Sequence, residues 1–128
     1  MANLSQIKRP EDLPSMTPSQ IAVELEGWAY IFNSGIGNPE RLNKEYREKM
    51  GTMLLFLSAL NQQAGSSGKN TYPVTLLDEV IGTLIFVRGA LADAYNKGKT
   101  PQVIVGKKIP KLARDLMKLG EQYKKMEK

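Results

Sequence analysis

The chain has 128 residues, of which 41% are hydrophobic and 24% are charged, and this size and composition are typical of one globular domain with a single core. It contains neither cysteine nor histidine, which excludes disulfide bonds, thiolate nucleophiles, imidazole bases and the usual zinc ligands. We therefore expect no enzymatic activity and no metal or other cofactor. Since the sequence also has no secretory signal and no apolar run of the roughly 18 residues that span a bilayer, we expect a cytoplasmic protein.

The net charge of +5 is distributed unevenly along the chain. Residues 1–96 contain eight Lys or Arg and ten Asp or Glu, a net charge of −2, whereas residues 97–128 contain ten and three, a net charge of +7. A basic segment of this kind indicates an anionic partner, such as nucleic acid, an acidic protein surface or an anionic membrane. The alternative is a solvated lysine face that only keeps the protein in solution.

An N-terminal arm, residues 1–16, contains prolines among polar residues, and we expect it to be irregular. The rest of the chain, residues 17–128, has the periodicity of helices separated by turns and is expected to fold as a single domain. Residues 100–105 are compatible with either a short helical turn or an extended piece. Four helices are predicted, over about residues 17–33, 38–63, 74–96 and 108–127.

Capping signals mark the starts of the first two helices. Thr17 and Gln20 have the spacing of a capping box, and Pro18 suits the first helical position. Asn38 followed by Pro39 repeats the arrangement at the second helix. The apolar residues of the first helix recur every three or four positions and so share one face: Ile21, Leu25, Trp28 and Phe32.

The second and third helices are expected to form the core. Residues 52–60 (TMLLFLSAL) are apolar on nearly every side, which predicts the central buried segment. Residues 64–70 (AGSSGKN) are predicted to connect this helix to the third one. The third helix has apolar residues at the spacing of a bundle seam, and Asp78 is placed to close a capping box with Thr75.

The final helix has the most regular pattern in the sequence. An apolar stripe recurs every three or four residues and is expected to pack on the bundle rather than form a coiled coil; it consists of Ile109, Leu112, Leu116, Leu119, Tyr123 and Met126. Lysines recur beside this stripe, so the helix is expected to dock with one face and present a basic face outward. The predicted anion-binding residues, called here the basic set, are Lys107, Lys108, Lys111, Arg114, Lys118, Lys124 and Lys125.

Other motifs are weak. Glu45 and Glu48 form an ExxE pair, which binds magnesium in some all-α hydrolases when a second acidic pair faces it, but the chain has no second pair at that spacing. Asp93 is interpreted as a paired structural carboxylate that is partly buried. Residues 17–27 resemble the first helix of a helix-turn-helix only until the turn, because the apolar periodicity continues through Gly27.

The sequence thus predicts an all-α, single-domain bundle of about four helices with a basic amphipathic C-terminal helix. Its expected function is non-catalytic binding of an anionic partner, with nucleic acid favoured over an acidic protein surface, through the basic set. The alternative is a protein–protein adaptor or oligomeric structural component of a phage or plasmid accessory type. In that alternative a homo-oligomer covers the excess apolar surface of the second and third helices. Binding to a membrane surface is the least favoured interpretation.

Overall fold

The computed structural model describes residues 8–35, 44–67, 73–98 and 104–126, and these residues form an all-α bundle without a strand. Four long helices make up the bundle, and two short helical segments precede the first and the last of them. In chain order the elements are η2 (Pro10–Ser15), α1 (Pro18–Gly35), α2 (Lys44–Ser67), α3 (Val74–Asn96), η4 (Ile104–Lys108) and α4 (Ile109–Met126). The predicted fold class is confirmed.

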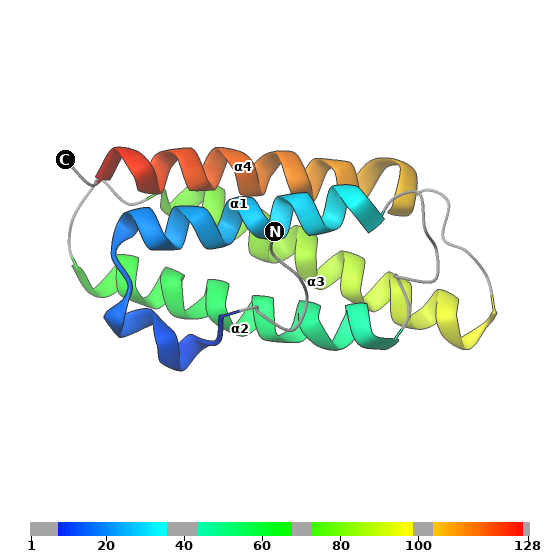
Figure 1. Cartoon of the computed structure of the whole chain (residues 1–128). Coiled ribbons are helices and arrows are strands. Elements are labelled where there is room, and N and C mark those ends of the chain that lie inside the picture. Colours follow the sequence, from blue (N-terminus) through cyan, green and yellow to red (C-terminus); the bar gives the residue numbers. More distant parts are fainter. Residues whose placement is uncertain (1–7, 36–43, 68–72, 99–103, 127–128) are drawn as a thin grey trace.

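The four helices form two packed layers, and successive helices run in opposite directions (Figure 1). The pair α1 and α4 forms one layer, and the pair α2 and α3 forms the other. Contacts between α3 and α4 join the layers, and η4 lies against α3 as it leads into α4. The basic C-terminal helix therefore lies on the outside of the bundle, packed on α1 and α3.

The start of α1 has the predicted capping box. Thr17 Oγ1 accepts the Gln20 backbone N–H at 3.2 Å, and Gln20 Oε1 accepts the Thr17 backbone N–H at 2.8 Å. These bonds satisfy two donors that the first helical turn leaves without backbone partners. The helix then continues through Gly27 without a turn, so it is not the first helix of a helix-turn-helix.

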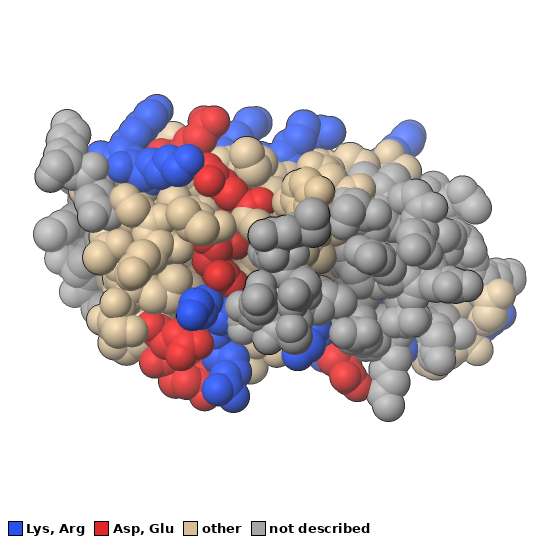
Figure 2. Space-filling model, in the orientation of Figure 1, with Lys and Arg blue, Asp and Glu red and all other residues tan. Residues whose placement is uncertain are grey.

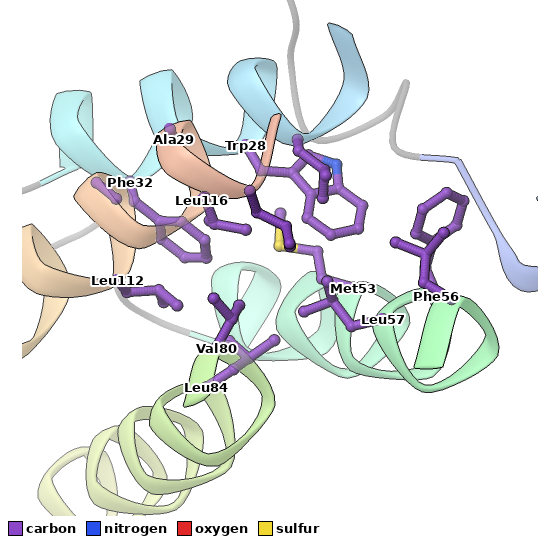
Figure 3. Packing of buried hydrophobic residues seen from close by; sticks show 14 of the residues in the cluster. Trp28, Ala29, Phe32, Met53, Phe56, Leu57, Val80, Leu84, Leu112 and Leu116 are labelled. Carbon is purple, nitrogen blue, oxygen red and sulfur yellow. The ribbon is translucent and has the colours of Figure 1, made fainter. Parts of the chain in front are cut away.

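All four helices contribute to the core, whereas the sequence predicts that the second and third helices form it and that the last helix docks on them. Side chains from both layers meet in the interior, as Figure 3 shows, and Trp28 of α1 contacts Phe56 of α2 edge-to-face with ring centroids 5.3 Å apart. A bundle of four amphipathic helices buries one stripe from each, and no helix is covered on every side. Leu55, in the predicted central segment, is accordingly 62% exposed.

A small residue allows α1 and α4 to approach closely. A Cβ atom at Gly120 would lie 3.0 Å from Glu26 Cγ and 3.3 Å from the Ala22 carbonyl oxygen. Ala29 lies seven residues after Ala22 on α1, and Ala113 lies seven residues before Gly120 on α4. Both alanines are buried. In an antiparallel pair these two positions fall in the same register, so small residues recur at the interface two turns apart.

Two segments differ from the prediction in their local structure. The described part of the N-terminal arm contains the 3₁₀ helix η2, in which Asp12 accepts the Arg9 backbone N–H at 2.9 Å and Leu13 is buried in the core. The helix α2 continues to Ser67 instead of ending at 63, because Ala64 extends the buried seam of that helix by one more turn. In both places the composition predicts an irregular segment, but burial of one apolar side chain stabilises a helical backbone there.

The remaining boundaries follow the prediction in the described residues. The third helix begins at Val74, so Thr75 lies inside it and the predicted capping box of Thr75 with Asp78 is wrong; Asp78 instead accepts a hydrogen bond from Asn61 Nδ2 of α2 at 3.1 Å. Residues 104 and 105, left open by the sequence, belong to the π-helical turn η4. The predicted cap at Asn38 and Pro39, the Glu45 side chain and residues 100–103 lie outside the described residues.

Candidate basic surface on the C-terminal helix

The predicted division of α4 into a buried and an outward face is confirmed. Five residues of its apolar stripe are buried, and Met126 at its end is half-buried. The exposed residues of this helix include Arg114, Lys118 and Lys125, which recur at four and seven residues and therefore share the face opposite the core. The core contacts thus orient the basic side chains away from the bundle.

One residue of the basic set is engaged within α4 itself. Lys111 Nζ lies 2.7 Å from Asp115 Oδ2, and the Asp115 side chain is only 10% exposed. This hydrogen bond raises the pKa of Lys111 above 10.5, against the opposing effect of its own partial burial. Lys111 therefore neutralises a nearly buried carboxylate, and its charge is not wholly available to an external anion.

A second residue of the basic set is engaged with the neighbouring helix. Lys124 Nζ lies 2.9 Å from Glu26 Oε2 of α1. The carboxylate is mostly covered, with 22% of its side chain exposed, whereas the lysine is half exposed. Lys124 consequently acts as a tie between α1 and α4, a role that its spacing in the sequence does not reveal.

Four residues of the basic set form an outward group, called here the unpaired row: Lys107, Arg114, Lys118 and Lys125. All four are exposed, and within the described residues their side chains have no ion pair or hydrogen bond. From Arg114 to Lys125 the row extends about 16 Å along the helix at 1.5 Å per residue. Figure 2 shows basic side chains following the edge of the molecule formed by α4.

Carboxylates limit the positive potential of this surface. Glu121 is exposed on α4, three residues after Lys118 and four before Lys125, and Figure 2 shows acidic side chains among the basic ones. The negative charge of Glu79, on α3, also raises the pKa of Lys111. The described segment 104–126 nevertheless has seven Lys or Arg against two Asp or Glu, a net charge of +5.

The seventh residue of the basic set, Lys108, lies over the ring of Phe86, a contact that was not predicted. Its Nζ lies 5.5 Å from the centroid of the Phe86 ring of α3. Phe86 is an apolar residue of the third helix, which is expected to form the core together with the second, yet 55% of the residue is exposed. A signal was present, since Leu84 and Val87 already supply the seam and Phe86 lies between them off that face.

The surface offers groups for binding anions and none arranged for metal chemistry. Within the described residues no group of three or more acidic side chains could hold a metal ion, and Glu48 is the described member of the ExxE pair. Asp93 is paired with Lys97 at 3.1 Å, as interpreted, but it is 67% exposed rather than partly buried. Its position at the end of α3, beyond the last core residue Leu91, explains the exposure.

Comparisons with known proteins leave the family of the chain open. No protein-family model, no curated protein and no solved structure matches it. Among the helices that the structure describes, none combines the length and the apolar character of a membrane span.

Proposed function

We propose that this protein is a non-catalytic helical protein of the cytoplasm that binds a nucleic acid through the outward face of α4. The observation that carries the proposal is the unpaired row: Arg114, Lys118 and Lys125 are held outward by α4, whose opposite face is buried, and Lys107 is exposed in η4 just before that helix. Ammonium and guanidinium groups without internal partners bind phosphates and release the counterions condensed on the nucleic acid. The expected interaction is therefore electrostatic and largely independent of base sequence.

The spacing of the row agrees with this function. Arg114 and Lys118 are one turn apart, about 6 Å, and Lys125 follows after about 10 Å more. A rigid helix thus presents several cations in line, so that one phosphate backbone can contact more than one of them without reordering the protein. Lys111 and Lys124 are excluded from the row because both neutralise carboxylates of the fold.

The test compares two triple variants with the same change in charge. Arg114→Gln/Lys118→Gln/Lys125→Gln removes part of the row, and Lys8→Gln/Arg9→Gln/Lys49→Gln removes one Arg and two Lys from the N-terminal segment and α2. Binding to labelled single-stranded and duplex DNA and to RNA is measured by anisotropy across a salt series. We expect the first variant to weaken binding at least about tenfold and to reduce the log–log salt slope by about 2 to 3.

The control triple should retain most of the affinity, and both variants should keep the helicity and melting temperature of the parent. Equal losses in the two variants would mean that net charge rather than the face of α4 governs binding. Absence of binding by the parent protein at low salt would remove the proposal altogether.

The second candidate function is a homo-oligomeric adaptor, and exposed apolar side chains on α2 and α3 support it. Leu55 and Ile85 are both mostly exposed, and Ile85 lines a groove of about 550 Å³ between the two helices, whose lining combines Leu54 and Ala92 with the charged residues Arg47, Glu48 and Arg88. Exposed apolar patches are typical of protein contacts. Light scattering of the parent and of Leu55→Gln/Ile85→Gln tests this candidate: it requires a multimer that the substitution dissociates.

A further inference from the structure

The exposed aromatic ring of Phe86 borders the basic surface. It projects from α3 with 55% of the residue exposed, beside the turn η4 that leads into α4. Lys108 of η4 covers part of it, with Nζ 5.5 Å from the ring centroid. An aromatic side chain next to several lysines supplies what a phosphate-binding surface alone lacks, namely a flat apolar group on which a ligand ring can stack.

Along the surface of α3, the positions on either side of this ring are glycines and carry no side chain. Gly82 lies four residues before Phe86 and Gly89 three residues after it, so both are its neighbours along the helix. A Cβ atom added at either glycine would meet nothing within 4 Å. The ring is therefore flanked by open space along the helix axis, which leaves room for a planar group beside it.

The lysines of η4 and α4 border the same strip of α3. Glu79, two turns before Phe86 and on the same side of the helix, is close enough to Lys111 to raise its pKa. Lys108 thus lies over Phe86 at this strip, and Lys111 is near enough for the charge of Glu79 to act on it. A nucleic acid bound along α4 would pass next to Phe86.

We propose that Phe86 is a stacking platform for an unpaired base, and that the protein prefers single-stranded nucleic acid whose phosphates contact Lys108 and the unpaired row. This inference rests on the proposed function and deepens it. In a duplex the bases are stacked on one another and their faces are unavailable, whereas in a single strand each base offers a π face. The base lies on the ring face away from Lys108, and the ammonium remains next to the phosphate chain.

The test uses fluorescein-labelled oligothymidylate and oligouridylate of about 12 nucleotides, a length within the site sizes of single-strand binding proteins, and a duplex of equal length. Phe86→Leu keeps an apolar side chain but removes the stacking face, Phe86→Trp keeps stacking, and Val23→Ala is the control at an exposed apolar residue of α1. We expect Phe86→Leu to weaken single-strand binding roughly 5- to 150-fold, the range of one base–aromatic stack. The salt slope and duplex binding should not change.

A spectroscopic measurement gives a second, independent readout. The parent has one tryptophan, the buried Trp28, so the fluorescence that Phe86→Trp adds to that of the parent reports on the introduced indole. This added fluorescence should be quenched when the oligonucleotide binds, because the base lies in contact with the indole. Parent affinity in Phe86→Leu, or no quenching in Phe86→Trp, would overturn the inference. If the Arg114→Gln/Lys118→Gln/Lys125→Gln variant still weakens binding in that case, the proposed function stands without the stacking platform. Failure of the parent to bind any of the three probes overturns both.

Discussion

Lys124 Nζ lies 2.9 Å from Glu26 Oε2, and this ion pair joins the last turn of α4 to the middle of α1. The Glu26 side chain also lies over Gly120, where the two helices come closest. A residue predicted to contact an external anion is therefore part of the fold. Partly covered pairs of this kind are worth more than fully exposed ones, but their net contribution is still modest.

We expect Lys124→Gln and Glu26→Gln each to lower the free energy of unfolding by up to about 1 kcal/mol, with a coupling energy in the double variant of roughly 0.5 kcal/mol. The loss arises because each single change leaves a half-covered charge without its partner. Urea unfolding of the four proteins in a double-mutant cycle measures the coupling. Additive effects would show that the pair contributes nothing to stability.

Glycine positions in the bundle are expected to respond in opposite directions to substitution. Gly120→Val should destabilise the protein by about 1 to 3 kcal/mol, because its Cβ would lie 3.3 Å from the Ala22 carbonyl oxygen, a backbone atom that cannot move aside cheaply. Gly82→Ala in the middle of α3 meets nothing within 4 Å and should stabilise the protein by about 0.5 to 1 kcal/mol. Thermal melting followed by circular dichroism checks both; the same sign for the two changes would contradict the close approach of α1 and α4.

Local signals predicted much of this fold. The Thr17–Gln20 capping box and the stripe from Ile109 to Tyr123 depend on residues a few positions apart, and both occur as predicted. The Lys111–Asp115 bond also joins residues four apart on one helix, so it could have been inferred from the sequence. Features that depend on residues three or four positions apart can thus be predicted from the sequence.

The features that were missed depend on neighbours distant in the sequence. Lys124 is paired because α1 brings Glu26 to it, and Phe86 is exposed because, within the part of the chain that the structure describes, only Lys108 of η4 lies over the ring. A composition that is apolar all round, as in residues 52–60, indicates burial without saying which side is covered. The basic set was predicted as one group; the spacing of four residues could have set Lys111 apart, but only the packing of α1 on α4 separates Lys124 from the unpaired row.

Because of the Lys111–Asp115 bond, we expect the free energy of unfolding to fall as the pH rises through the alkaline range. Because the pKa of Lys111 is raised above 10.5 in the folded protein, its stabilising effect is complete below pH 10.5 and is lost as the pH rises through the folded-state pKa. Other lysines and tyrosines titrate in the same range, so the parent is compared with Lys111→Gln. The difference in their free energies of unfolding should be largest near neutral pH and should shrink above pH 10.5.

Asp115→Asn provides the control for this titration. It removes the negative charge that favours the ammonium form of Lys111, while the amide oxygen can still accept a hydrogen bond, so the effect of adding Lys111→Gln to it should depend less on alkaline pH than the same change in the parent. Urea unfolding of the four proteins at several pH values gives the two differences. A parent-versus-variant difference that stays constant across the alkaline range would show that the ammonium form of Lys111 is not preferentially stabilised by folding.

Glu121 interrupts the unpaired row, so its charge should oppose nucleic-acid binding. It is exposed between Lys118 and Lys125, and a carboxylate within about 10 Å of a bound phosphate repels it at low salt. We expect Glu121→Gln to strengthen binding roughly two- to fivefold at low ionic strength, an effect on the order of 0.5 to 1 kcal/mol that diminishes as salt is added. Glu11→Gln, which makes the same charge change at an exposed position of η2, should leave the affinity nearly unchanged. Both variants carry one negative charge less than the parent, so any difference in affinity between them reflects the position of the charge and not the net charge. If anisotropy titrations show equal gains for the two, the nucleic acid does not lie along the outward face of α4.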